Sequence, residues 1–420
     1  MYSFDEVKNA DPELAKAMEQ ETGRQNDHIE LIASENFVSD RVKQAVGSCM
    51  MLKYTEGYPS KESIAKFQEK YPDYVHTGNI GRYYGGCENF DELELYCRYM
   101  WQKVFKTDYH VNVQPHSGSS ANMEVYASVL EPGDTVLSMS LNNGAHLTHG
   151  SPVNFSGKLY NMVFYGVNQY GRIDIDDIYN KVITYKPKMV VVGASAYARA
   201  IPYHTIRTII DLAAMKAGID APYMFVDMAH IAGLIVSGDH ESPFGVADFI
   251  TTTTQKTLRG NRGGIIFCKP EYAKKIDSAV FPGNQGGSLM NEIAGKAVTA
   301  EEALTPEFKE YGHQIIENAK AMADEFIKLG FKLVTDGTDN HLILLDLTGI
   351  GVNGKQVQDE LDKHGITLNK NMVPNDTRSP AQTSGVRIGV PAQTTKGWKE
   401  EDFIKCADKI AEIIRGMKTE

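Results

Sequence analysis

The sequence predicts an α/β protein in which a large region with a mostly parallel sheet is followed by a smaller α+β region. Between about residues 90 and 300, helical stretches alternate with short apolar runs. This alternation is typical of helices that cross over between the parallel strands of a buried sheet. Beyond residue 304 the pattern changes to one long helix, short strands and a closing helix. A chain of 420 residues is long enough for two such regions.

The strands of the large region are predicted where β-branched and other apolar residues cluster in short runs. The expected strands are residues 111–114, 135–139, 189–193, 223–227, 248–252 and 264–268. In sheets of this type, ligands bind beyond the carboxyl ends of the strands. The polar residues that follow these strands are therefore the candidates for a functional site.

The smaller region begins with a well-marked helix. Thr305 can cap this helix and Pro306 suits its first turn. We interpret its apolar stripe as core; the stripe consists of Tyr311, Ile315, Ala319, Met322, Phe326 and Leu329, before Gly330. Residues 331–334 and 341–347 are expected to form strands, and residues 402–417 a closing helix.

The composition, with 42% hydrophobic and 23% charged residues, is ordinary for a globular protein. A formal charge of -11 argues against nucleic acid or an anionic membrane as the main partner. The amino terminus has no signal-like core, and no apolar run approaches membrane-spanning length, so we expect a cytoplasmic protein without membrane contact. Five widely spread cysteines predict reduced, mostly buried thiols, without disulfides or a zinc site.

Lys256 stands where the predicted strand 248–252 runs out into a polar loop. Threonines occupy positions 251–254, and glycines follow at 260, 263 and 264. Threonine hydroxyls can bond an anionic group, and glycine allows close backbone approach. A lysine at a strand exit is usually only solvated. A lysine held in such a pocket can instead lose its proton and form an imine with an aldehyde.

Other strand exits carry polar residues with two possible interpretations each. Asp227 ends a predicted strand and is either a helix cap or a carboxylate at the ligand-binding edge. The segment 117–122 opens a helix and is either an ordinary cap or a phosphate cradle. His146 and His149 lie three apart, but no third ligand is placed nearby in the sequence, so we predict no metal site. Arg387 forms either a surface salt bridge or a guanidinium fork for a carboxylate.

Several long motifs occur in one order along the chain. They are residues 28–36 (His-Ile-Glu-Leu-Ile-Ala-Ser-Glu-Asn), 83–88 (Tyr-Tyr-Gly-Gly-Cys-Glu), 227–234 (Asp-Met-Ala-His-Ile-Ala-Gly-Leu), 248–264 around Lys256, and 387–392 (Arg-Ile-Gly-Val-Pro-Ala). Together they resemble the serine hydroxymethyltransferases, pyridoxal-phosphate enzymes that interconvert serine and glycine with tetrahydrofolate as one-carbon carrier. The resemblance covers nearly the whole chain. It implies a transferase of the aspartate-aminotransferase-like fold, fold type I, with a seven-stranded, mostly parallel sheet.

The resemblance also implies a division of the chain. Residues 1–50 would be an arm that packs on a partner subunit, residues 51–303 the large pyridoxal-phosphate-binding domain, and residues 304–420 the small domain. Residues 60–81 are an insertion relative to the family pattern. Within it Ile64, Phe67 and Tyr71 have helical spacing before Pro72, so we expect one or two amphipathic turns in a surface excursion over the rim of the site.

Cofactor-binding residues are implied by the same resemblance. Lys256 would hold the cofactor, Asp227 would keep the pyridine nitrogen protonated, and His146 would stack on the ring. The phosphate would be held by Ser117, Gly118 and Ser119, with Gln255 beside it and with Tyr54, Gly286 and Gly287 reaching it from the other subunit. Ser195 and His230 would bond the phenolic oxygen or the substrate carboxylate. A homodimer with shared active sites is therefore expected, and its pairing into tetramers is left open.

Substrate-binding residues follow in the same way. Arg387, assisted by Ser34, would clamp the carboxylate of the amino acid, and Glu56 with Tyr83 and Tyr84 would form an acid/base cluster at the substrate side chain. The implied catalytic set is Lys256, Glu56, Asp227, His230 and Tyr84. The implied folate contacts are Leu141, Ala145, Leu147, Asn371 and Ser379.

Departures from the family pattern leave folate use open. Gln255 replaces a histidine, Asn291 replaces a histidine, and Ala381 replaces a phenylalanine near the folate. One alternative is a folate-independent aldolase or transaldolase that acts on threonine or another β-hydroxy or α-methyl amino acid. Another is a binding or regulatory protein without cofactor chemistry, which retention of Lys256, Asp227 and Arg387 argues against.

Overall fold

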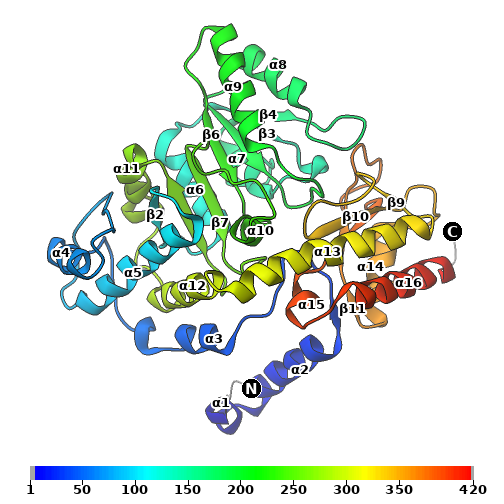
Figure 1. Ribbon diagram of the computed structural model, residues 1–420, viewed down its shortest axis with the longest axis horizontal. Helices are drawn as coiled ribbons and strands as arrows, with labels where there is room; N and C mark the ends of the chain where they lie inside the picture. The colour runs from blue at the N-terminus through cyan, green and yellow to red at the C-terminus, as the bar shows by residue number, and fades with distance from the viewer. Residues whose placement is uncertain (1–4, 418–420) are drawn as a thin grey trace.

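A seven-stranded sheet forms the centre of the computed structural model, which describes residues 5–417 (Figure 1). Its strands lie in the order β2-β8-β7-β6-β5-β3-β4. Strand β8 runs antiparallel to β7 and β2, and the remaining pairs are parallel. The strands are β2 (His110–Asn112), β3 (Thr135–Met139), β4 (Asn161–Tyr165), β5 (Met189–Gly193), β6 (Tyr223–Asp227), β7 (Phe249–Thr253) and β8 (Gly264–Cys268). The predicted mostly parallel α/β architecture is confirmed.

Four of the six predicted strands have the expected bounds; β7 is displaced by one residue, and β2 begins one residue earlier and ends two residues earlier than predicted. Strand β7 begins after Asp248, because this side chain accepts the backbone N–H of Met224 at 2.8 Å and so caps the strand start. Strand β2 ends at Asn112, whose side-chain oxygen accepts the N–H of Gln114 at 3.0 Å. Strand β4 was not predicted.

Helices cover both faces of this sheet and separate its core into two clusters. Val190 and Val192 of β5 point into one cluster, while Met189 and Val191 point into the other, as expected for alternating side chains. The helices are α5 (Glu88–Phe105), α6 (Gly118–Val129), α7 (Phe155–Leu159), α8 (Ile175–Tyr185), α9 (Tyr203–Ala217), α10 (Ala232–Ser237), α11 (Ala273–Ser278) and α12 (Met290–Ala303). Short 3-10 or π turns lie at Cys49–Met51, Leu141–Asn143, Leu147–His149, Pro270–Tyr272 and Ala279–Asn284.

The carboxyl-terminal region holds a four-stranded antiparallel sheet. Its order is β12 (Asn369–Asn371), β13 (Gly385–Gly389), β10 (Leu342–Asp346) and β9 (Lys332–Leu333), and its helices are α13 (Pro306–Lys328), α14 (Gly354–Lys363), α15 (Pro391–Thr395) and α16 (Glu400–Gly416). Thr305 caps α13 as predicted. Helix α16 begins two residues before the predicted start, because Asp402 lies in its first turn and accepts the N–H of Lys399.

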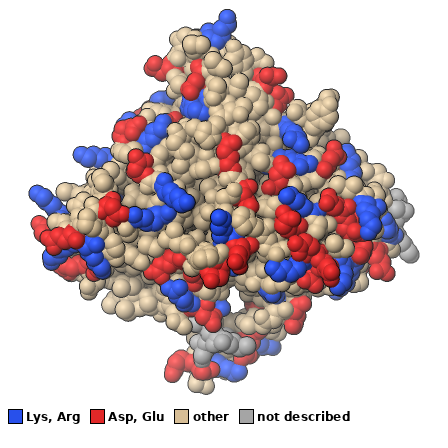
Figure 2. All heavy atoms as spheres, viewed as in Figure 1, with Lys and Arg blue, Asp and Glu red and all other residues tan. Residues whose placement is uncertain are grey.

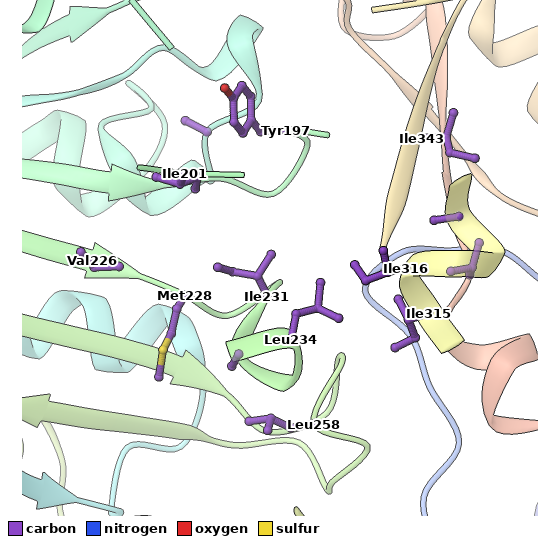
Figure 3. Packing of buried hydrophobic residues seen from close by; sticks show 14 of the residues in the cluster. Tyr197, Ile201, Val226, Met228, Ile231, Leu234, Leu258, Ile315, Ile316 and Ile343 are labelled. Atoms are coloured by element: carbon purple, nitrogen blue, oxygen red, sulfur yellow. The ribbon is translucent and has the colours of Figure 1, made fainter. Parts of the chain in front are cut away.

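One hydrophobic core joins the two sheets. Figure 3 shows Ile231 and Leu234, beside the large sheet, facing Ile315 and Ile316 of α13, with Ile343 of β10 beyond them. The functional residues at the edges of both sheets are thus held in fixed relation by packed side chains.

The amino-terminal segment extends along the lower edge of the molecule in Figure 1. It comprises α1 (Asp5–Ala10), α2 (Pro12–Asp27) and α3 (Asp40–Val46), and β1 (Ile29–Glu30) pairs with β11 (Ile366–Thr367). Leu14 and Met18 of α2 are exposed. Acidic and basic side chains are interspersed over the face in Figure 2. No helix in residues 5–417 combines the length and apolarity needed to cross a membrane.

The insertion is amphipathic and helical as predicted, but its helix is longer than the expected one or two turns: α4 (Lys61–Lys70) has 10 residues and lies at the outer edge beside α5 (Figure 1). Ser60 caps this helix. Ile64 and Phe67 are buried against Tyr74, which belongs to the insertion, and against Leu95 of α5. The insertion does not line the pocket that contains Lys256. We expected a surface excursion. The insertion instead forms a small hydrophobic cluster of its own.

Buried polar bonds attach the far end of the insertion to the main body. Asp277 accepts the N–H of Asn79 at 2.8 Å and lies 2.7 Å from His110 Nε2. Thr77 Oγ1 lies 2.9 Å from the other nitrogen of the same imidazole. Nothing in the sequence identifies Asp277 and His110 as partners of residues so distant in the chain. The insertion is therefore an integral part of the fold.

We expect Phe67→Ala to lower the free energy of unfolding by about 3 kcal/mol, because it removes a buried aromatic ring and leaves a cavity. Urea denaturation would measure the change. Val75→Ala, at a position of the same insertion that is 67% exposed, should change stability by less than about 0.5 kcal/mol. An unchanged unfolding midpoint for Phe67→Ala would show that the insertion is not part of the cooperative core.

Candidate active site

A pocket of about 340 Å³ lies at the carboxyl ends of the parallel strands. It brings together eleven of the predicted site residues from separate parts of the chain. They are Ser34, Ser117, Gly118, Ser119, His146, Ser195, Asp227, His230, Gln255, Lys256 and Arg387. Strands β5, β6 and β7 deliver Ser195, Asp227 and Lys256 respectively, since each residue ends its strand or closely follows it.

The Lys256 amine is buried and has one hydrogen bond, from Nζ to Thr253 Oγ1 at 3.1 Å. The pKa of this amine is lowered to about 8: burial lowers it most, the charge of Asp227 opposes the shift, and the charges of Arg387 and Arg262 add to it. Its backbone is fixed, because Asn36 donates to the Lys256 carbonyl at 2.9 Å. Most of this amine is still charged at neutral pH, but its neutral, nucleophilic fraction is far larger than that of a lysine with the ordinary pKa.

Asp227 has the opposite electrostatic behaviour. Burial alone would raise its pKa, but the hydrogen bond and charge of His149 hold the pKa well below the ordinary value. Its Oδ2 accepts Asn122 Nδ2 at 2.9 Å and lies 3.0 Å from His149 Nε2, while Oδ1 accepts the N–H of Ala229 at 3.1 Å. The pocket therefore contains a fixed carboxylate that can hold a protonated ring nitrogen.

Two neutral imidazoles line the pocket. Burial, with help from His149, lowers the pKa of His146 to about 4, and Nδ1 of His146 accepts the N–H of Thr148 at 3.2 Å. Burial also holds the pKa of His230 well below its usual value. His230 Nδ1 lies 3.1 Å from His341 Nε2, and His341 Nδ1 is buried without a partner.

These contacts assign the proton positions of the histidine pair. A buried N–H without an acceptor is costlier than an unused lone pair, so His341 carries its proton on Nε2. His341 then donates to Nδ1 of His230. The proton of neutral His230 is therefore on Nε2, which makes His230 a hydrogen-bond donor toward the pocket.

The amino terminus of α6 provides a cradle for an anion. The side chain of Ser117 caps the helix by accepting the N–H of Ser120 at 3.3 Å. The N–H groups that precede Ser120 in this first turn have no partner within the helix, which favours a phosphate there. Gly118 permits a close approach, because a Cβ at this position would lie 2.6 Å from Thr253 Cγ2.

Arg387 is a buried guanidinium with no carboxylate within 4.0 Å among the residues that the structure describes. Burial lowers its pKa to about 10, against the charge of Glu35. It donates to the Ser195 carbonyl at 2.7 Å and to Asn369 Oδ1 at 3.1 Å, which leaves other N–H groups free. This arrangement fits the carboxylate of a ligand, which would supply the missing counter-charge.

Five predicted residues lie outside this pocket, in a separate group on the same chain. The rings of Tyr54 and Tyr84 are 5.6 Å apart. Added Cβ atoms at Gly286 and Gly287 would lie 3.4 Å from Glu56 Oε1 and 3.1 Å from the Tyr54 ring. One chain therefore does not assemble the complete predicted site.

The predicted folate contacts are also outside the pocket. Leu141 and Leu147 are 41% and 48% exposed on the turns that flank His146, and Ser379 is exposed as well. Ala145 is buried, and Asn371 ends strand β12. These positions do not form a common cavity with Lys256.

The expectation that His146 and His149 have no third potential metal ligand nearby is wrong, because the fold supplies one. The fold places Asp227 beside them, with one ligand atom from each residue within 4.8 Å of the others. The sequence could not show this neighbour, which is 78 positions from His149. The hydrogen bond from His149 accounts for the position of Asp227 without an ion.

Several residues of the site were not predicted. Asn122 ties Asp227 to β7, because its Oδ1 accepts Thr251 Oγ1 at 2.6 Å. Arg262, Glu35 and Thr253 also line the pocket. All four of these residues lie within the segments that resemble the family, and this position could have identified them as site residues: Asn122, Arg262, Glu35 and Thr253. His341 begins a predicted strand, and no sequence pattern indicates its contact with His230.

A comparison with known protein families agrees with this geometry. The sequence model of the family described as serine hydroxymethyltransferase matches residues 7–410, nearly the whole chain.

The reaction of Lys256 with a small aromatic aldehyde should become faster as pH rises and level off above about pH 8, since only the neutral amine attacks. Initial rates in cofactor-stripped protein, followed by borohydride trapping and peptide mapping, would measure this dependence. Lys256→Ala should remove the trapped product. A midpoint at the ordinary lysine value of 10.5 would contradict the assigned pKa.

Proposed function

The chain belongs to the serine hydroxymethyltransferase family, and from this premise we propose that it converts serine and tetrahydrofolate reversibly to glycine and methylenetetrahydrofolate. Membership makes it a pyridoxal-phosphate-dependent transferase. The observation that carries the specific proposal is the meeting of Lys256, Asp227 and Arg387 in one pocket, where an amine with a lowered pKa, a fixed carboxylate and an unpaired guanidinium all face the same space.

The residues present fit the cofactor. Pyridoxal phosphate supplies an electron sink for the bond that breaks at the substrate's α-carbon. Lys256 would bind its aldehyde, Asp227 would hold the proton of the ring nitrogen, and His146 would cover the ring. Ser117, Gly118 and Ser119 would bind the phosphate at the start of α6. The buried Gln255 Oε1 has no partner in the described chain and is available beside this cradle.

Arg387 and Ser34 would orient the amino acid through its carboxylate, and His230 would donate from Nε2 to the phenolic oxygen or to that carboxylate. Removal of the hydroxyl proton from serine needs a base. Glu56, with Tyr84 beside it, is our candidate, although both lie outside the pocket of their own chain.

We propose that a second copy of the chain supplies this acid/base group, together with Tyr54, Gly286 and Gly287. Leu52 and Tyr83, which are 87% and 71% exposed, adjoin this group in the sequence and are available for contact with a partner. The active unit would be a homodimer, with residues 1–50 as an arm on the partner and residues 51–303 and 304–420 as the two domains.

A second candidate function is folate-independent cleavage of threonine or a related β-hydroxy amino acid. The exposed positions of Leu141, Leu147 and Ser379 favour it, because no folate cavity is formed within one chain. The same Lys256 pocket would serve both reactions. Folate dependence therefore separates the two functions.

Formation of glycine from L-serine should depend strongly on tetrahydrofolate and should exceed cleavage of threonine at equal concentration. The holoenzyme would be assayed with each amino acid, with and without tetrahydrofolate, by quantifying glycine. Arg387→Lys should raise the KM for serine by about 10- to 100-fold, because it loses the bidentate contact. Equal serine cleavage with and without tetrahydrofolate would favour the second function.

Mixing Lys256→Ala with Tyr54→Ala subunits should restore part of the activity if sites are shared. Each variant alone should be nearly inactive, whereas a mixed dimer contains one site with both residues intact. Refolding the mixture and assaying against each separately refolded variant would measure the recovery. Absence of recovery in mixed dimers that are shown to form would mean that one chain builds the whole site.

A further inference from the structure

Lys296 of α12 is a buried cation whose hydrogen-bond partners are all backbone carbonyls. It is 1% exposed, and Nζ donates to Val113 at 2.7 Å, to Pro115 at 2.9 Å and to Gly264 at 2.9 Å. An ammonium group has three protons, so these bonds use its whole donor capacity. Its position is therefore fixed.

The three carbonyls belong to the two segments that carry the cofactor-binding residues. Val113 and Pro115 lead directly into the cradle at Ser117, while Gly264 closes the loop that follows Lys256. Gly264 also donates its N–H to the Pro115 carbonyl at 3.1 Å. The stem of Lys296 passes close to Gly263, where an added Cβ would lie 2.3 Å from Cε. One side chain thus joins the cradle to the Lys256 loop.

The charge of Lys296 has no counter-ion in the described chain, where no carboxylate lies within 4.0 Å of its Nζ. The titratable groups that interact electrostatically with Lys296 are Cys97 and Glu94 of α5, Glu124 of α6, Glu292 of its own helix, and His116 in the segment before the cradle, whose pKa is lowered by burial and by the charge of Lys296. Glu94 is paired with Arg82 and Arg98, and Glu292 bonds Asn261.

Glu124 does not neutralise the charge either. Its carboxyl is fully buried with no partner on either oxygen, and burial raises its pKa to about 9 despite the opposing charge of Lys296. Glu124 is therefore protonated at neutral pH. Burial lowers the pKa of Lys296 to about 8, which leaves most of the amine charged at pH 7.

We propose that Lys296 is a positioning residue for the phosphate end of the cofactor: it sets the spacing between the cradle and Lys256, and its unpaired charge selects a dianionic ester. This inference rests on the proposed use of pyridoxal phosphate. A bound dianion at the start of α6 would provide the counter-charge that the chain lacks, and a charge in a low-dielectric interior acts over several ångströms.

The test compares two aldehydes that differ only in the phosphate. Dissociation constants of pyridoxal phosphate and of pyridoxal would be measured by absorbance titration of cofactor-stripped wild-type protein and Lys296→Met. We expect the variant to lose about tenfold or more in affinity for pyridoxal phosphate and less than about twofold for pyridoxal. A general loss of pocket structure would weaken both ligands equally, and that result would overturn the proposal.

Lys181→Met is the matched control. Lys181 of α8 also donates from Nζ to a backbone carbonyl, that of Phe164, but it is paired with Asp177 and contacts neither the segment that leads to Ser117 nor the Lys256 loop; α8 lies far from α12 in Figure 1. This variant should keep the wild-type ratio of the two affinities. If Lys181→Met also reduced the ratio of the affinity for pyridoxal phosphate to that for pyridoxal, a specific role for Lys296 would be overturned.

A measurement on the wild type decides the question if Lys296→Met does not fold. The preference for pyridoxal phosphate over pyridoxal should begin to decline near pH 8, as Lys296 loses its proton in the cofactor-free protein and before the buried Glu124, whose pKa is about 9, becomes charged. Titration of Lys256 affects both aldehydes and cancels in the ratio. A ratio that is constant from about pH 7 to 9.5 would overturn the proposal. Failure of the wild type to bind either aldehyde would instead overturn the proposed function itself.

Discussion

The pocket depends on one electrostatic contrast: the same small space must keep an amine partly neutral and a carboxylate charged. Burial acts on both groups in the direction of neutrality, and it succeeds at Lys256 because that amine has only a threonine hydroxyl as partner. At Asp227 burial is overcome by the hydrogen bond and the charge of His149, while Asn122 and the Ala229 N–H hold the carboxylate in place. The difference in protonation between the two groups therefore comes from their hydrogen-bonding and charged partners, since both groups are buried. Two titratable groups whose pKa values are shifted apart in this way are typical of sites of acid–base chemistry.

These partners explain why a parallel sheet suits the site. Asp227 ends β6 and Thr251 lies in the neighbouring strand β7, while Asn122 comes from α6 and bonds both side chains. The same amide also donates to Thr148 Oγ1 at 2.7 Å, on the turn next to His146. A single asparagine thus aligns the carboxylate, the turn that carries His146 and the first turns of α6. Displacement of any one element would disturb the other two.

The sequence predicts much of this arrangement, but only where the information is local. Strand ends at Asp227 and near Lys256 follow from apolar runs that stop at polar residues, and Thr305 with Pro306 gives the start of α13. The bond between His230 and His341 joins positions 111 residues apart and leaves no periodic trace. The separation of Tyr54 and Glu56 from Lys256 is equally invisible in the sequence, because it depends on how segments fold back on one chain.

The insertion can lengthen the chain without moving Glu56, because hydrogen bonds join the two backbone segments that flank the insertion. Tyr58 donates its N–H to the Gly81 carbonyl and Tyr83 donates to the Glu56 carbonyl, both at 2.9 Å. Arg82 reinforces this closure by donating to the carbonyls of Thr55 and Gly57, each at 2.8 Å, while its other nitrogens pair with buried carboxylates of α5. Residues 54–58 and 81–84 are therefore held in register whatever the length between them. Since a longer loop adds only a small closure entropy, the position of Glu56 and the presence of α4 are separable features of the fold.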